Sequence, residues 1–157
     1  MSWTQDFNAA RGNAAALSDI QDFSQLVKLA EAVGKDLNAD GVSSRQIRVL
    51  LSETTAGVSR IRRGRTLGMG QMPADDARAD KQQIALQLDK AAKREAALLN
   101  ISLIYNAGRD KKGNVSIKQL AELMEKMTAH VNTFEDFKVL RKFSEAVMAY
   151  FKFHGGK

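Results

Sequence analysis

Residues 134–157 have the sequence FEDFKVLRKFSEAVMAYFKFHGGK, in which large apolar side chains recur every three or four residues. This spacing places one apolar stripe along a helix, as expected for an element that is buried on one side. The stripe consists of Phe134, Phe137, Leu140, Phe143, Val147 and Tyr150. Thr133 is suited to cap the start of this helix, and Gly155 and Gly156 are suited to end it.

Four stretches upstream show the same helical period, and no stretch of convincing length alternates as a strand does. The expected helices cover residues 18–34, 43–63, 76–107 and 116–131. Three of them begin with a capping-box pair, namely Ser18 with Gln21, Ser43 with Gln46, and Ser116 with Gln119. Gly34 is expected to end the first. The chain of 157 residues suits one domain, so we predict an all-α fold, a single compact bundle of about five helices.

Two segments lack this regularity. Residues 1–16 contain five Ala, two Asn and one Gly and have no clear period, so we expect a flexible N-terminal arm, although Trp3 and Phe7 are able to dock. Residues 17–157 are then the helical domain. Within it, residues 64–75 hold three glycines and the only proline, which predicts a flexible loop with a basic beginning.

The centre of the core is expected in the second half of the long helix over residues 76–107. Residues 96–105 are apolar nearly all round, which is typical of a helix that is buried on every side. We therefore expect Phe143 and Tyr150 to pack against Leu99 and Tyr105. An aromatic stripe of this kind is more often core than a base-stacking surface.

Positive charge is concentrated in one short stretch. Residues 45–65 contain six arginines and one acid, so +5 of the net charge of +6 falls within 21 residues. Such an arginine cluster is typical of a protein that binds a phosphate backbone. The alternative is a solvated, basic helix end beside a loop.

Several classes of activity are disfavoured by residue content. The chain has no cysteine and two histidines, and it shows no Gly-rich phosphate loop or nucleophile motif, so we expect no catalytic residue, no metal and no cofactor. Residues 36–47 and 110–121 begin like calcium loops, but Ile47 and Ala121 stand where the bidentate Glu is needed. The N-terminus does not resemble a secretory signal and no apolar run is long enough to span a bilayer, so a cytoplasmic protein without membrane contact is expected.

Residues 43–64, SSRQIRVLLSETTAGVSRIRRG, also resemble a helix-turn-helix in pattern, with a helix, a glycine and then a helix rich in Ser and Arg. With Gly57 as the turn glycine, Glu53 and Arg63 occupy positions that need a small and a buried aliphatic side chain. A small helical DNA-binding regulator is therefore a secondary hypothesis.

Three blocks of the chain resemble one known family. Residues 134–157 are similar to the closing helix of the small subunit of type III-A CRISPR–Csm effector complexes, with Ala149-Tyr150, Lys152 and a Gly-Gly-Lys tail. SSRQIRVLLSE, residues 43–53, resembles the family's Ser-Gln-Ile-Arg helix start. LLNISLIYNAGRD, residues 98–110, resembles its buried helix with a Tyr-Ala-x-x-Arg end. The resemblance covers about residues 24–157.

The resemblance implies a non-catalytic, all-helical subunit that stacks in several copies along the duplex of crRNA and target RNA. Its partners would be crRNA and target RNA, the repeated backbone subunit, the large polymerase-nuclease subunit and further copies of itself. Small subunits of type III-B or III-D complexes remain the alternative. Together with the charge pattern, the resemblance to the type III-A family gives the expected nucleic-acid-binding residues. These are Arg45, Arg48, Arg60, Arg62, Arg63, Arg65, Arg109, Lys111, Lys112 and Lys152.

Overall fold

The computed structural model describes residues 2–69 and 77–157, with side chains described for residues 2–64 and 81–157. Over these residues the chain is all-helical, with six α-helices, one short 3-10 helix and no strand. The elements are α1 (Trp3–Arg11), η1 (Leu17–Asp19), α2 (Phe23–Ala39), α3 (Ser44–Met69), α4 (Ala77–Gly108), α5 (Val115–Thr128) and α6 (Phe134–Phe153). The predicted all-α class is confirmed, with one α-helix more than the expected five.

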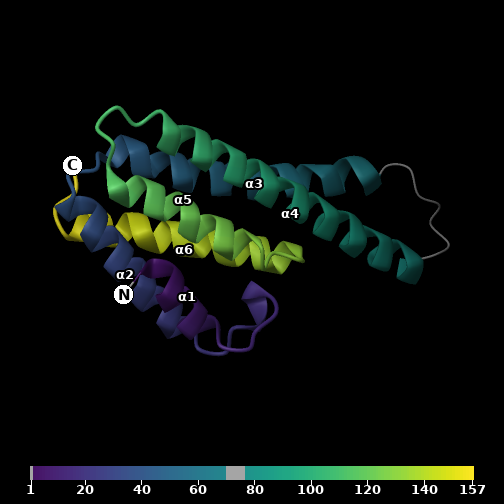
Figure 1. Cartoon of the computed structure of the whole chain (residues 1–157). Helices are drawn as coiled ribbons and strands as arrows, with labels where there is room; N and C mark the ends of the chain where they lie inside the picture. Colours follow the sequence, from purple (N-terminus) through teal and green to yellow (C-terminus); the bar gives the residue numbers. More distant parts are fainter. Residues whose placement is uncertain (1, 70–76) are drawn as a thin grey trace.

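Helix α6 is central to the fold, because it packs against α2, α3, α4, α5 and η1. Its inner face is almost fully buried, with Phe137, Leu140, Phe143, Val147 and Phe151 at 1% exposure or less. Four of the six residues of the predicted stripe therefore face the core, whereas Phe134 and Tyr150 are only half-buried and Phe151 is buried in place of Tyr150. Figure 1 shows α3 and α4 along one side of the molecule and α1 and α2 on the other, with α5 and α6 between them.

Gly34 does not end a helix, as the sequence suggested, but lies inside α2 at the contact with α6. A Cβ atom on Gly34 would lie 2.7 Å from the Phe151 backbone nitrogen and 2.8 Å from the Val147 carbonyl oxygen. The missing side chain thus allows two helix backbones to approach closely. The helix continues to Ala39 because this packing outweighs the low helix propensity of glycine.

Gly34→Ala should therefore destabilise the protein by about 1–3 kcal/mol, because the added methyl group overpacks the α2–α6 contact. The matched control is Gly64→Ala in α3, where a Cβ would meet nothing within 4 Å. That substitution should stabilise the protein by about 0.5–1 kcal/mol, since alanine is the better helix former. Urea unfolding measures the change in the free energy of unfolding for both variants. A change of the same sign in both would contradict the close approach of α2 and α6 at Gly34.

The N-terminal segment differs from the expected flexible arm. Residues 3–11 form α1, and Trp3 and Phe7, four residues apart, are buried on one face of it. The Trp3 indole also donates a hydrogen bond to Asp36 Oδ2 at 3.1 Å. Composition alone suggested a loose segment, but two aromatic anchors at helical spacing hold it against α2 and α5.

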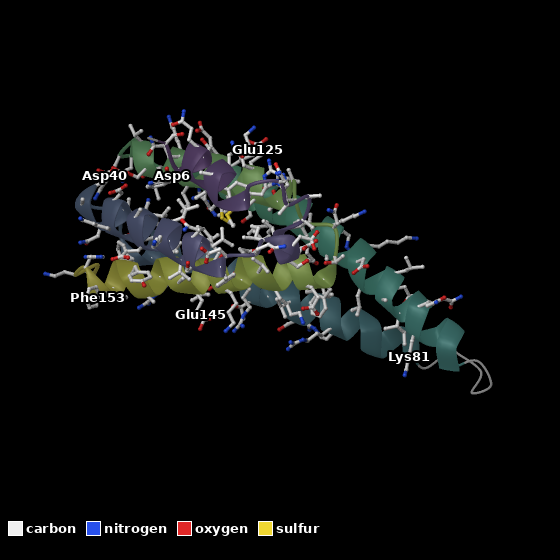
Figure 2. The ribbon with its side chains drawn as sticks, turned by 90° about the horizontal axis from the view of Figure 1, so that it is seen from below. Asp6, Asp40, Lys81, Glu125, Glu145 and Phe153 are labelled. Carbon is white, nitrogen blue, oxygen red and sulfur yellow. The ribbon has the colours of Figure 1, made fainter. Side chains whose placement is uncertain are left out.

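Helix α3 also differs from the sequence-based prediction. It continues through Gly57 and Gly64 to Met69, so residues 64–69 are helical, and residues 70–75 of the expected loop lie outside the described residues. Gly57 packs against the Phe137 ring, where a Cβ would lie 2.5 Å from the ring Cζ. Because no turn interrupts α3 at Gly57, the helix-turn-helix hypothesis is wrong. In Figure 2, Lys81 near the start of α4 lies far from the end that carries Asp40 and Phe153.

The second half of α4 is not buried on every side, as its composition suggested. One face, with Ala92, Ala96, Leu99, Leu103 and Ala107, is in the core. The opposite face is exposed, at 47% for Leu98, 65% for Ile101, 53% for Ile104 and 61% for Tyr105. The expected packing of Phe143 and Tyr150 against Tyr105 is therefore wrong. The neighbours α3, α5 and α6 cover one apolar face of α4 and leave the other uncovered.

Candidate nucleic-acid interface

A groove between the start of α3 and the α4–α5 loop brings together cations that are far apart in the sequence. Arg45 lies in the first turn of α3, whereas Arg109 and Lys111 follow the end of α4. All three line a cavity of about 280 Å³ with an apolar floor that includes Leu50, Leu103 and Ile117. We call this site the basic groove. It unites three of the residues predicted to bind nucleic acid.

Local hydrogen bonds fix both walls of the basic groove. Ser43 and Gln46 form the predicted capping box, with Ser43 Oγ accepting from the Gln46 N–H at 3.4 Å and Gln46 Oε1 accepting from the Ser43 N–H at 3.1 Å. On the other wall, Asp110 Oδ2 accepts the Asn114 N–H at 2.7 Å, and Gly113 adopts a positive φ of 63°. Gln46 Nε2 then donates to Asp110 Oδ1 at 3.3 Å and joins the two walls.

The cations of the basic groove are available to a ligand. Within residues 2–64 and 81–157, none of Arg45, Arg109 and Lys111 forms an ion pair. The one carboxylate of the groove, Asp110, is occupied by the hydrogen bonds of Asn114 and Gln46. The Arg109 guanidinium lies 5.4 Å from the centre of the Tyr105 ring, a contact that orients it without neutralising its charge.

A second group of cations lies where α3 meets α6. It surrounds a depression lined by Thr55, Val58 and Ser59 of α3. We call it the α3–α6 patch, and it consists of Arg62, Lys138, Arg141 and Lys142. Sequence analysis predicted Arg62 but missed the three α6 residues. Their signal was their spacing of three and four residues, which places Lys138 beside Arg141 and Lys142 on the surface of α6.

Contacts inside the α3–α6 patch keep its cations in place. Phe134 lies between two of them, with the Arg62 guanidinium 6.0 Å and the Lys138 ammonium 5.0 Å from its ring centre. Lys138 pairs with Glu135 at 2.6 Å, and Lys142 lies 3.5 Å from Glu145. Exposed pairs of this kind contribute only about 0–1 kcal/mol, so they leave the lysines free to contact a phosphate.

Arg60 has a different environment from the other arginines of α3. Its guanidinium contacts the Glu95 carboxylate at 2.9 and 3.0 Å, and Glu95 is buried at 3% exposure. The hydrogen bond to Glu95 raises the pKa of Arg60 above its ordinary value. Arg60 therefore neutralises a buried carboxylate at the α3–α4 contact. A phosphate group would have to displace Glu95 in order to bind Arg60.

The other predicted residues are spread over the surface. Arg48, Arg63, Lys112 and Lys152 are exposed, and the side chain of Arg65 lies outside the described residues. Arg48 points away from the core, as its position beside the buried Ile47 required. Lys152 is in the last turn of α6. These residues extend the basic surface but do not belong to either cluster.

The described residues contain no group of three or more His, Cys, Asp or Glu side chains that is able to hold a metal ion. No helix in the described ranges is both long enough and apolar enough to cross a membrane.

Comparison with known proteins gives one match. A family model described as Csm2 Type III-A matches residues 20–157. No curated protein and no solved structure matches the chain. The matched range begins after α1 and includes the whole basic groove and the whole α3–α6 patch.

Proposed function

Since the chain belongs to the Csm2 type III-A family and is thus a subunit of a type III-A CRISPR–Csm complex, we propose that it is the non-catalytic subunit that holds the guide–target RNA duplex. In this role, several copies stack beside the repeated backbone subunits, near the large polymerase-nuclease subunit. Base pairing between crRNA and target supplies the sequence information, so the protein has to recognise only the shape and charge of the backbone.

The observation that carries this proposal is the convergence of Arg45, Arg109 and Lys111 in the basic groove. Arg45 and Arg109 are 64 residues apart in the sequence and neither forms an ion pair with the described residues, while Asp110 is the one carboxylate among the lining residues, so the groove keeps an excess of positive charge for an anion. Guanidinium and ammonium groups are the usual partners of phosphate oxygens. A continuous polyanion thus fits the groove better than an acidic side chain of the same chain.

The α3–α6 patch supplies a second contact with the same backbone. Arg45 and Arg62 lie on the same helix, 17 residues apart, which places them about 25 Å apart along its axis. Two cationic sites at this separation, held by one rigid helix, fit an extended ligand. This geometry favours a nucleic-acid strand over a small anion.

The test is the salt dependence of RNA binding by the Arg45→Ala/Arg109→Ala/Lys111→Ala variant. Each phosphate contact contributes about 0.7–0.9 to the slope of log affinity against log salt, so the triple variant should flatten that slope by about 2–3. Fluorescence anisotropy with guide–target duplexes of two unrelated sequences measures it. The loss should be the same for both duplexes.

The charge-matched control is Lys28→Ala/Lys35→Ala/Lys126→Ala, which removes three exposed cations from α2 and α5. Equal loss in both triple variants would show that net charge alone drives binding, and would overturn the site. Incorporation into the complex with crRNA is measured in parallel. If the groove variant bound RNA with unchanged affinity but failed to join the complex, the groove would instead contact a carboxylate of a neighbouring subunit.

A further inference from the structure

The floor of the basic groove is apolar, which phosphate binding alone does not explain. Helices α3 and α5 both pack on α4, and the groove lies between them. Leu50, Leu103 and Ile117, one from each helix, line the floor at 8% exposure or less. A phosphate group is strongly hydrated and gains nothing from contact with such side chains. The cations therefore account only for the rim of the site, and the floor suits a ligand that also has an apolar part.

The groove also presents one amide that has no partner among the described residues. Asn106 lies one helical turn after Leu103 in α4, lines the groove and is half-buried, and its side chain forms no hydrogen bond there. The other amide of the lining, Gln46, is engaged by Ser43 and Asp110. An asparagine amide offers one acceptor oxygen and two donor hydrogens, which is the pattern that pairs with the polar edge of a nucleobase. Floor, amide and cations are thus three complementary parts of one site.

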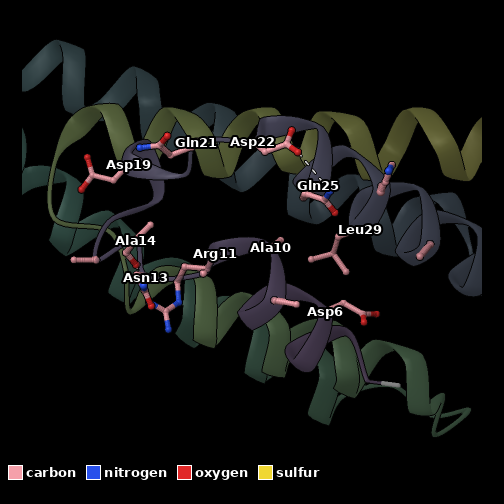
Figure 3. A pocket seen from close by; sticks show the side chains of 15 residues that line it. Asp6, Ala10, Arg11, Asn13, Ala14, Asp19, Gln21, Asp22, Gln25 and Leu29 are labelled. Atoms are coloured by element: carbon pink, nitrogen blue, oxygen red, sulfur yellow. Dashed lines mark hydrogen bonds between the residues drawn. The ribbon is translucent and has the colours of Figure 1, made fainter.

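A larger cavity of the molecule lacks this combination. It lies between α1, η1 and α2 and has a volume of about 1090 Å³ (Figure 3). Its lining carries charges of both signs, from Asp6, Asp19, Asp22, Arg11 and Lys28. Carboxylates in this number repel a polyanion as strongly as the two cations attract it. We call it the mixed-charge cavity, and it provides a control site for the basic groove, where three cations accompany one carboxylate.

We propose that the basic groove holds one unpaired nucleotide of the bound RNA. Its base lies on the apolar floor with its edge at Asn106, and its flanking phosphates contact Arg45, Arg109 and Lys111. A paired base is covered by its neighbours in the duplex, whereas an unpaired base is free to leave the stack and enter a protein site. The inference rests on the proposed function, because it identifies the part of the RNA that occupies the groove.

The size of the groove agrees with this occupant. Pockets for drug-sized ligands have volumes of roughly 300–1,000 Å³, so a cavity of about 280 Å³ suits a smaller group such as one base. Most of the polar groups stand at the rim, where the sugar and phosphates leave the cavity. The remaining phosphates of the same strand are then able to continue along α3 towards Arg62 and the α3–α6 patch.

The test compares two RNA ligands that differ by one base. The first is a guide–target duplex with one extra, unpaired nucleotide in the target strand, and the second is the same duplex with the base of that nucleotide removed. Both ligands carry the same phosphates, so the ratio of their affinities reports on the base alone. The natural chain should bind the first about five- to tenfold more tightly, near the lower end of what one bound base contributes. Fluorescence anisotropy measures both affinities.

Two substitutions in the groove place the base there. Ala121→Leu fills the cavity from α5 and should abolish the difference between the two ligands. Asn106→Ala removes the amide at the base edge and should reduce the difference about two- to fivefold. Because Asn106 forms no hydrogen bond with the described residues, its variant still decides the question if Ala121→Leu fails to fold. The matched control is Ala9→Leu, an exposed lining residue of the mixed-charge cavity, which should keep the full difference.

Three outcomes would overturn the proposal. Equal affinity of the natural chain for both ligands would leave the apolar floor to a side chain of a neighbouring subunit, and a difference that survives in both groove variants would place the base elsewhere on the protein. Loss of the difference when excess free nucleoside monophosphate is added would assign the groove to a free nucleotide. The salt slope of the triple variant counts phosphate contacts and does not depend on the base, so failure of this proposal and failure of the proposed function are distinguishable.

Discussion

Phe143→Ala is expected to lower the free energy of unfolding by about 3–5 kcal/mol, because the ring is fully buried and its removal leaves a cavity. Phe143 is 1% exposed and lies midway along α6, the helix that contacts most of the others. The neighbouring backbones belong to helices that are themselves packed, so the site has little room to collapse. Urea unfolding followed by circular dichroism measures the loss.

The matched control lies on the same helix. Phe153 is 81% exposed, so Phe153→Ala should change stability by no more than about 0.5 kcal/mol. RNA binding of Phe143→Ala, measured well below its unfolding midpoint, should be unchanged. A Phe143→Ala protein that unfolds like the natural chain but loses RNA binding would make this ring a base-stacking group and contradict its place in the core.

Asp136→Asn is expected to cost about 2–4 kcal/mol at neutral pH, because the carboxylate is buried and accepts three backbone hydrogen bonds. Its Oδ1 accepts the Ser18 N–H at 2.8 Å, and its Oδ2 accepts the N–H groups of Asn132 at 2.8 Å and Thr133 at 2.9 Å. One side chain thus ties η1 to the start of α6. An amide has one acceptor oxygen, so at least one of these donors loses its partner.

The same site predicts a pH dependence. Burial opposes ionisation of Asp136, but hydrogen bonds from Ser18, and then from Asn132 and Thr133, hold its pKa below the ordinary value. The unfolded chain therefore binds the proton more readily than the folded one. The stabilisation is complete well above the unfolded pKa of about 3.9 and is lost as pH falls through the lower folded pKa.

The measurement is the stability difference between the natural chain and Asp136→Asn from pH 7 down to pH 3. The difference should be constant at the upper end and shrink in the acidic range. Asp22→Asn, at an exposed helix cap, should show a much smaller difference throughout. A difference for Asp136→Asn that stays the same down to pH 3 would show that the charge of Asp136 is not responsible.

The sequence by itself indicated five of the six α-helices over the described residues and some of their local signals, but not α1 or the true ends of α2 and α3. The 3.6-residue period of α6 predicted its buried face, because that face depends on which side chains lie on one side of a single helix. The capping box at Ser43 and the cap of α6 at Thr133 were likewise readable, since a cap is formed by residues three positions apart. The boxes predicted at Ser18 and Ser116 are wrong, because α2 begins after Asp22 and α5 begins after Asn114. The concentration of arginine in residues 45–65 predicted a basic surface on the same local basis.

Tertiary structure alone decided which of these features meet. The sequence suggested that Gly34 ends a helix, but the structure shows that it allows close contact with α6. Helix α4 has two apolar faces, and its neighbours cover one of them. Arg60 and Arg62 are two residues apart, yet one neutralises the buried Glu95 and the other joins α6 cations. Helical periodicity specifies a face but not its partner, because the partner is set by packing between residues distant in the chain.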